Sequence, residues 1–350
     1  MNKNIYSWHK NLWQELISRK QGLPHALLLH GQAGTGKRDF AETLAHAMLC
    51  ESPAENGLPC GCCAACAWLA AGTHPDFHVL QPASETALES AQHDEAEDEK
   101  PRGEKEKKAK HLIVVDQVRA LIESITLSAG RGGMRVILVH PAEALNPNAA
   151  NALLKTLEEP APNTLFILVS HQIQRLLPTV RSRCLKVAMS MPSVSGALAW
   201  LVEHGVYDGE ALLAQAGGAP LRALELADGG YREKRVAFLS HLQENSDPLA
   251  LAETGEKLEM AWVLNWLQTW IYDLICAHAT QKVRYHPDFQ DRLAVLSQSI
   301  DVKKLLEFQR DLLGAQKSLH HPLNPRLVLE QLLLTFWQIM KRTQEHSHVR

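Results

Sequence analysis

Residues 31–38 read Gly-Gln-Ala-Gly-Thr-Gly-Lys-Arg and follow the phosphate-binding loop pattern G-x-x-x-x-G-K-[S/T] up to its last position. The glycines of such a loop let backbone N–H groups close around phosphates, and the lysine neutralises their outer oxygens. The final Ser or Thr normally holds Mg²⁺, which Arg38 cannot coordinate. The stretch therefore predicts a loop that cradles a nucleotide but is poorly equipped to hydrolyse it. The candidate nucleotide-binding residues are Gly31, Gly34, Thr35, Gly36 and Lys37.

The surroundings of this loop support the motif. An apolar run at residues 26–29 predicts a buried strand before the loop, and the pattern at 39–49 predicts a helix after it. Further short aliphatic runs predict the other strands of a parallel sheet covered by helices. They lie at 78–80, 112–115, 136–139 and 165–169. The alternative is that the loop survives only as a tight turn and stays empty.

Composition sets broad limits on the chain. Its 350 residues are 45% hydrophobic and 21% charged, which is typical of a soluble globular protein with two or three domains. A formal net charge of −3 gives no global attraction to nucleic acid. The N-terminus begins no apolar run, and no stretch approaches the ~18 apolar residues that span a bilayer. We therefore expect a cytoplasmic protein with no membrane partner.

Five of the seven cysteines lie between Cys50 and Cys66. In a reducing cytosol, thiolate ligation of a metal explains such a cluster better than disulfides do. Cys50, Cys60, Cys63 and Cys66 follow C-x9-C-x2-C-x2-C, which predicts a structural Zn²⁺ with all four positions filled by sulfur. Cys62 could compete for one position. The alternative is a group of buried or redox-active thiols.

Residues 81–110 interrupt the α/β pattern. Five of residues 94–99 are acidic, and six of residues 100–110 are basic. Such a segment cannot bury enough apolar surface to order itself, so we interpret it as a disordered surface insertion. A DNA-binding role for its basic half is the alternative, although the acidic half would partly cancel its field.

The C-terminal part of the chain is predicted to be helical. Strand patterns stop near residue 190, and Pro192 marks a boundary. Amphipathic patterns predict helices near 232–244, 255–279, 302–319 and 324–342. Trp262, Trp266 and Trp270 recur every four residues on one face, which favours helix–helix packing over a subunit contact.

Two more segments indicate a family. Residues 148–160 read Asn-Ala-Ala-Asn-Ala-Leu-Leu-Lys-Thr-Leu-Glu-Glu-Pro, and residues 179–184 read Thr-Val-Arg-Ser-Arg-Cys. With the loop and the cysteines, they resemble bacterial clamp-loader subunits of the AAA+ superfamily over most of residues 20–230. This resemblance implies an α/β RecA-like AAA+ domain at 1–190, with a zinc module at about 50–66 and the insertion at about 81–110. A small helical lid at 191–231 and an all-α collar at 232–350 would follow.

Within that family, the chain resembles a non-hydrolysing subunit more than the ATP-hydrolysing gamma/tau motor subunits. Motor subunits carry Asp-Glu at the end of the strand that precedes the Leu-Leu-Lys-Thr segment. Here His140 and Pro141 follow that strand, and Glu143 comes two residues too late. Loss of both acids, together with Arg38, removes metal binding and water activation. The alternative is an active clamp-loader ATPase with an unusual site.

The resemblance also assigns roles to arginines. It makes Arg183, in Ser182-Arg183-Cys184, an arginine finger that reaches ATP held by the next subunit, where it would stabilise transition-state charge. Alternatively, Arg183 only pairs with a carboxylate at the interface. Ser170 falls at a polar sensor position, and Arg222 falls where the lid's sensor arginine lies. Arg222 would allow ATP or ADP to bind without turnover, or is simply a solvated charge.

The implied function is that of a comparatively rigid stator in the clamp loader of DNA polymerase III. Its partners would be gamma/tau motor subunits and a delta subunit in a hetero-oligomeric ring. Through that complex it would act on the sliding clamp and primer-template DNA, while other subunits carry the nucleotidyltransferase chemistry. A plain scaffold with a vestigial loop and finger is the remaining alternative.

Overall fold

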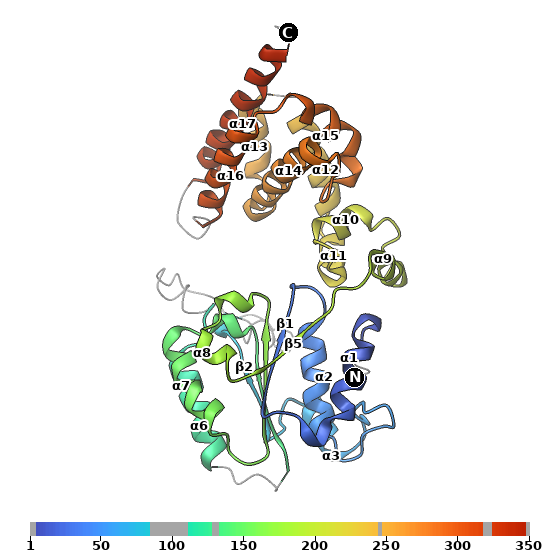
Figure 1. Ribbon diagram of the computed structural model, residues 1–350, viewed down its shortest axis with the longest axis vertical. Coiled ribbons are helices and arrows are strands. Elements are labelled where there is room, and N and C mark those ends of the chain that lie inside the picture. Colours follow the sequence, from blue (N-terminus) through green and yellow to red (C-terminus); the bar gives the residue numbers. More distant parts are fainter. Residues whose placement is uncertain (1–4, 85–110, 128–132, 244–246, 318–323, 348–350) are drawn as a thin grey trace. The chain divides into compact units, whose positions relative to one another are not determined.

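The computed structural model describes residues 5–84, 111–127, 133–243, 247–317 and 324–347 (Figure 1). The chain forms two compact units, Met1–Pro192 and Ser193–Arg350, and each is described by itself. Residues 85–110 of the predicted insertion lie outside the described residues. The predicted division of the C-terminal part near residue 231 remains a prediction.

The first unit is built on a five-stranded parallel sheet of order β2-β3-β4-β1-β5. Its strands are β1 (Ala26–His30), β2 (Phe77–Leu80), β3 (Arg135–Val139), β4 (Thr164–Ser170) and β5 (Leu185–Ala188). Its α-helices are α1 (Lys10–Ser18), α2 (Lys37–Leu49), α3 (Ala64–Ala70), α6 (Val115–Leu127), α7 (Pro147–Glu158) and α8 (Pro178–Arg181). Short 3-10 turns are η1 (Ser7–His9), η2 (Lys20–Gly22), η3 (Ala142–Ala144) and η4 (Ile173–Arg175).

Helices cover both faces of this sheet, with α6 and α7 on one side and α1 and α2 on the other (Figure 1). Successive strand side chains point to opposite faces. Leu28 therefore packs with the α6–α7 side, while Leu27 and Leu29 pack with the α1–α2 side. Every residue of β3 and β4 is buried, which explains their uninterrupted aliphatic runs. The expected α/β core is confirmed.

Two details of the sheet differ from the sequence prediction. Residues 112–115 do not form a strand: Ile113 makes only an isolated bridge to Leu145, and Val115 begins α6. The Val114 N–H donates to Gln117 Oε1 at 2.9 Å, which caps the helix start, and Ile113 is apolar because it is fully buried. Conversely, β5 was not predicted, because three of its four residues are exposed and β1 is its only partner among the described strands.

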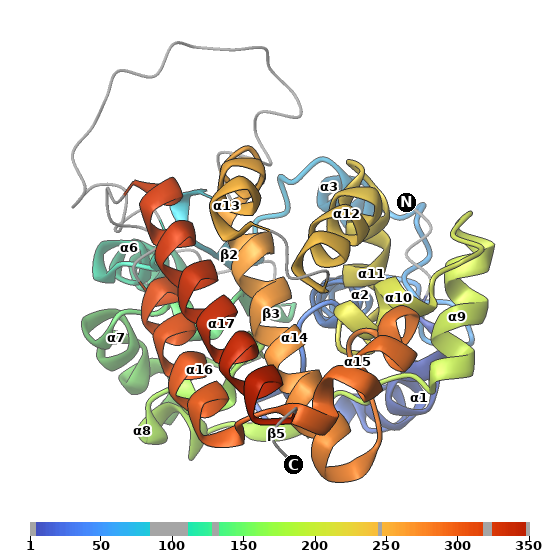
Figure 2. The same cartoon turned by 90° about the horizontal axis from the view of Figure 1, so that it is seen from above.

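The described residues of the second unit form an array of helices without strands. They are α9 (Val194–Glu203), α10 (Glu210–Gln215), α11 (Pro220–Ala227), α12 (Tyr231–Gln243), α13 (Pro248–Glu256), α14 (Met260–Thr280), α15 (Gln290–Leu296), α16 (Val302–Lys317) and α17 (Pro325–Ser347), with 3-10 turns η5 (Pro287–Phe289) and η6 (Ser297–Ser299). Helices α16 and α17 run side by side, and α13 and α14 also contact this pair (Figure 2). The helix predicted near 255–279 is confirmed as α14, although it begins later, at Met260, and the separate helix α13 before it was not predicted.

Tryptophans on α14 form the centre of this unit. Trp266 and Trp270 are fully buried, and Trp262 packs against the same core, as the packing interpretation predicted. Trp266 Nε1 donates to the Tyr231 hydroxyl at 2.7 Å, which satisfies a polar atom that burial would otherwise penalise. Across the described part of the chain, every helix is too short or too polar to cross a bilayer.

Candidate functional site

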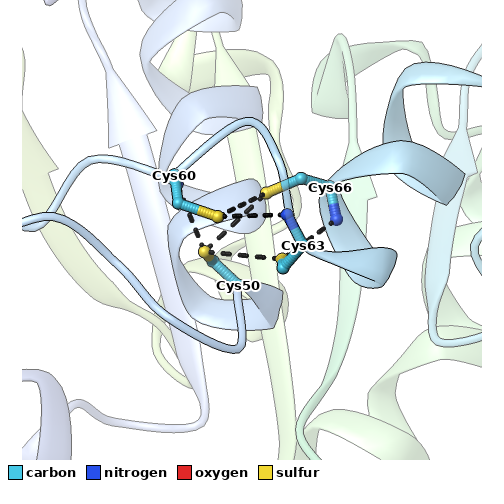
Figure 3. A group of neighbouring side chains, drawn as sticks. All are labelled: Cys50, Cys60, Cys63 and Cys66. Carbon is cyan, nitrogen blue, oxygen red and sulfur yellow. Dashed lines mark hydrogen bonds between the residues drawn. The ribbon is translucent and has the colours of Figure 1, made fainter.

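The four cysteines of the predicted metal set come together in the first unit (Figure 3). Cys50 follows the last residue of α2, Cys60 lies in the next loop, Cys63 caps α3 and Cys66 lies in its first turn. All four sulfur atoms lie within 4.8 Å of one another. Three sulfur pairs are separated by 3.7–3.9 Å, namely Cys50–Cys63, Cys60–Cys66 and Cys50–Cys66. The cluster could hold a metal ion.

Backbone donors surround these sulfurs. The Cys63 N–H lies 3.3 Å from Cys60 Sγ, and the Cys66 N–H lies 3.4 Å from Cys63 Sγ. Donation from the Cys62 N–H, the Ser52 hydroxyl and the Cys63 N–H lowers the pKa of Cys60 to about 5. These donors favour the thiolate of Cys60, the form that ligates metals, whereas burial raises the pKa of Cys50 and of Cys66. Cys62 is exposed and lies outside the group of four, so it does not compete for a place in this geometry.

The phosphate-loop backbone has the expected strand–turn–helix form between β1 and α2. Gly34 and Gly36 have φ values of +75° and +85°, a region that residues with a Cβ rarely adopt. Gly36 also precedes the first residue of α2, so its position fixes where the helix N-terminus points. A Cβ on Gly36 would collide with the ring of Tyr6. The glycines are therefore required by the turn and by a close aromatic neighbour.

The polar side chains of this loop point back onto the loop itself. Lys37 is 2% exposed, and its Nζ donates to the Gln32 carbonyl. Burial lowers the pKa of Lys37 to about 8, against the opposing influence of the Glu143 charge. Thr35 is fully buried, and its hydroxyl also donates to the Gln32 carbonyl, at 3.1 Å. The lysine that would neutralise a phosphate is thus hydrogen-bonded to a carbonyl of the loop itself.

Two aromatic residues near the N-terminus pack on the loop. Trp8 Nε1 donates to the Thr35 carbonyl at 3.0 Å, and the Tyr6 hydroxyl donates to Asp39 Oδ2 at 2.7 Å. The two rings stack with centroids 4.9 Å apart and planes 6° apart. Sequence reasoning missed both residues, because nothing in their spacing connects them to the loop.

Arg38 contacts one side chain on its own helix and one just beyond the end of β2. Its Nε donates to Glu42 Oε1 at 2.9 Å, one turn along α2, and its Nη2 donates to Gln81 Oε1 at 3.2 Å. Gln81 follows β2, so this contact joins α2 to the edge of the sheet. The spacing of Arg38 and Glu42 is that of a helical ion pair, a signal that sequence reasoning could have used.

The residues at the predicted acid positions provide no carboxylate there. His140 is 8% exposed, and burial together with the positive charge of Arg38 lowers its pKa to about 3. Pro141 follows it through a cis peptide bond. Glu143 lies on η3, where its Oε1 accepts the His171 N–H at 2.9 Å. The Ser170 hydroxyl, fully buried at the end of β4, accepts the Gln172 N–H at 3.2 Å.

The two predicted nucleotide-contacting arginines lie in different units. Arg183 follows α8 and forms an ion pair with Glu158, the last residue of α7. Its Nη1 also donates to the Thr179 carbonyl at 2.8 Å. Arg222 lies on α11, where its Nη1 is 3.1 Å from Glu225 Oε2 on the exposed surface. Within its unit, Arg222 therefore has the environment of a surface charge.

Comparisons with known proteins agree over nearly the whole chain. The family described as DNA polymerase III, delta subunit, matches residues 8–193, and its C-terminal family matches residues 230–338. The DNA polymerase III subunit delta' of Pseudomonas aeruginosa is 37% identical over 95% of this chain and 97% of its own length. The Escherichia coli subunit delta' is 29% identical, with 94% of each chain covered. The Escherichia coli subunit tau is 25% identical, with 89% of this chain and 49% of tau covered.

Proposed function

The chain belongs to the family of DNA polymerase III delta-prime subunits, clamp-loader components of DNA replication, and we propose that it acts there without hydrolysing ATP. Arg38, which carries the proposal, pairs with Glu42 and Gln81 at the position of the magnesium hydroxyl. A guanidinium cannot bind Mg²⁺, and neither His140 nor Pro141 can polarise a water through a carboxylate. Three separate requirements of hydrolysis are therefore missing together.

The chain's own chemical contribution would be made by Arg183 in a neighbouring subunit's site. Its side chain is 32% exposed, so its charge is accessible from outside the chain. A guanidinium beside a γ-phosphate stabilises the charge that grows in the transition state, and such fingers typically raise rates by ~10³–10⁵. In this proposal, the chain completes a site whose nucleotide belongs to another subunit.

The assembly that we propose contains gamma/tau motor subunits and a delta subunit in a hetero-oligomeric ring in the cytoplasm. The described helices of residues 232–347 would serve as the collar that joins the subunits, and residues 191–231 would form the lid. Similarity to tau, together with the delta-prime relatives, supports membership of such a complex. The sliding clamp and primer-template DNA would be reached through the complex.

The metal that we propose for the four cysteines is structural Zn²⁺. A tetrahedron with Zn–S bonds of about 2.3 Å has edges of about 3.8 Å. The three sulfur–sulfur distances of 3.7–3.9 Å fit that edge. Because four sulfurs leave no open position for water, the ion would hold the end of α2 to α3 and take no part in hydrolysis.

Nucleotide binding without turnover is a second candidate activity of the loop. The left-handed conformations of Gly34 and Gly36, which let backbone N–H groups approach phosphates, favour it. Lys37 Nζ would first have to leave the Gln32 carbonyl, and this competition would weaken the affinity for ATP or ADP.

The test of the non-hydrolysing assignment is ATP hydrolysis by the purified chain alone, with magnesium and primed DNA present. We expect no turnover above background. Turnover that is lost in Lys37→Ala would show an active motor subunit and would overturn the assignment. A metal-free, fully folded chain would separately overturn the zinc proposal.

A further inference from the structure

We propose that Glu158 is a positioning residue for the guanidinium of Arg183. The inference rests on the proposed function, because Glu158 matters here only if Arg183 acts on a neighbour's nucleotide. Arg183 Nη2 and Glu158 Oε1 form an ion pair between two different elements, the end of α7 and the turn after α8. Glu158 is therefore a contact of Arg183 that comes from a different element, outside the turn in which the arginine lies.

The guanidinium of Arg183 is held at both terminal nitrogens. Its Nη1 donates to the Thr179 carbonyl at 2.8 Å and lies 3.4 Å from Ser182 Oγ. The Ser182 hydroxyl itself donates to the Thr179 carbonyl at 3.0 Å. These contacts fix one terminal nitrogen within the local turn, and Glu158 fixes the other. Without Glu158, the guanidinium would keep partners on one nitrogen only and could rotate.

Glu158 is attached to a well-fixed helix end. The preceding residue, Leu157, is 1% exposed, and its carbonyl accepts a hydrogen bond from His25 Nε2 at 2.8 Å. At the other end of α7, the Asn146 side chain accepts the Ala149 N–H at 2.8 Å and caps the helix. The carboxylate thus extends from a rigid element and can impose a position on Arg183.

The ion pair between Glu158 and Arg183 is expected to add little to the stability of the fold, so stability does not explain a carboxylate at position 158. Glu158 and Arg183 side chains are 48% and 32% exposed, and exposed ion pairs stabilise folds only weakly. A carboxylate in the last turn of a helix also opposes the helix dipole. Holding Arg183 is a better reason for this carboxylate. A guanidinium that is already in position does not have to reorient when the transition state forms.

The experiment is a double-mutant cycle in the assembled clamp loader, measured as steady-state ATP hydrolysis with clamp and primed DNA. It uses Glu158→Ala, Arg183→Ala and their combination, with Glu158→Asp as the conservative variant and the exposed neighbour Glu159→Ala as control. We expect Glu158→Ala to lower kcat by roughly 3- to 30-fold, the upper limit being the rate equivalent of an arginine's rotamer entropy. The KM for ATP should stay unchanged, Glu158→Asp should restore part of kcat, and Glu159→Ala should match wild type.

The decisive comparison is between the effect of Glu158→Ala in the wild-type chain and its effect in the Arg183→Ala variant. There, Glu158→Ala should have no further effect, because nothing remains to be positioned. Equal effects in both backgrounds, or a lower kcat that accompanies loss of assembly on gel filtration, would overturn the inference and leave Arg183 as the finger. Unchanged kcat in Glu158→Ala, with a drop in Arg183→Ala, would do the same. If Arg183→Ala itself has no effect, both the finger and its positioning residue are wrong.

Discussion

Arg38 Nε lies 2.9 Å from Glu42 Oε1, so the cation at the position of the magnesium ligand is neutralised by its own helix. The guanidinium is turned toward the end of β2, where it also donates to Gln81. Its positive charge helps to keep His140 neutral. Arg38, Glu42, Gln81 and His140 are therefore linked by contacts or charge, so Arg38 is not an isolated substitution.

This replacement predicts that restoring the hydroxyl alone does not restore activity. Arg38→Thr should leave ATP hydrolysis by the isolated chain at background, because His140 and Pro141 still provide no acid. The variant should remain folded, since a helical ion pair of this kind is worth less than about 1 kcal/mol. The measurement is phosphate release with magnesium present, and turnover that also disappears in Lys37→Ala would contradict the prediction.

Buried neutral His140 predicts an acid-sensitive first unit. Its pKa is about 3 in the folded chain and near 6.5 when unfolded, so the unfolded state binds the proton more readily. The stability that depends on neutral His140 is present above pH 6.5 and is lost as the pH falls below it. The expected loss is at most about 1.4 kcal/mol per pH unit. Denaturant unfolding at pH 7 and pH 5 should therefore show a shallower pH dependence in His140→Asn; equal dependence would contradict this.

The cysteine cluster predicts a metal content that depends on specific sulfurs. The purified chain should contain about one Zn²⁺, and Cys63→Ser combined with Cys66→Ser should lose it and lower the melting temperature. Cys62→Ser is the matched control, because Cys62 lies beside the cluster but outside the group of four. Atomic emission analysis would settle the ratio. Metal loss in Cys62→Ser with retention in the double variant would reverse the assignment.

An ion pair between buried Arg235 and partly exposed Asp288 in the second unit predicts a clear stability effect. Arg235 is 1% exposed and donates from Nη1 and Nη2 to the two carboxylate oxygens of Asp288, each at 2.8 Å, while Nη2 also reaches His286 Nδ1 at 2.7 Å. Arg235→Ala removes both hydrogen bonds to the Asp288 carboxylate and should lower the free energy of unfolding by about 1.5–3 kcal/mol. The exposed pair of Arg232 and Asp208 is the control, where Arg232→Ala should cost less than about 1 kcal/mol. Similar denaturant midpoints for the two variants would contradict this.

Local patterns predicted the sheet and the metal set well. Continuous aliphatic runs marked β1, β3 and β4 because these strands are buried on both faces, and the cysteine spacing alone marked the four sulfurs that converge. The same rule failed at Ile113, which is buried beside a helix start, and at β5, which is an exposed edge strand. Burial, not strand propensity, was the property that the pattern detected.

Contacts between distant parts of the chain were not predictable in this way. Tyr6 packs on Gly36, and Arg183 pairs with Glu158, but these partners are far apart in sequence and share no periodicity. The backbone of the loop could be predicted from its glycines. The hydrogen bond from Lys37 Nζ to the Gln32 carbonyl could not be predicted, because it depends on the side-chain conformation that Lys37 adopts in the folded loop.

The most direct test of the account is ATP hydrolysis by a clamp loader assembled with Arg183→Ala, compared with Arg181→Ala, at a constant concentration of clamp and primed DNA. Arg181 lies two residues away, so its variant controls for the loss of a positive charge in this turn. We expect a clear fall in turnover for Arg183→Ala alone, with both complexes intact by gel filtration. Turnover in Arg183→Ala equal to wild type would contradict the trans arginine finger and leave this chain as a scaffold.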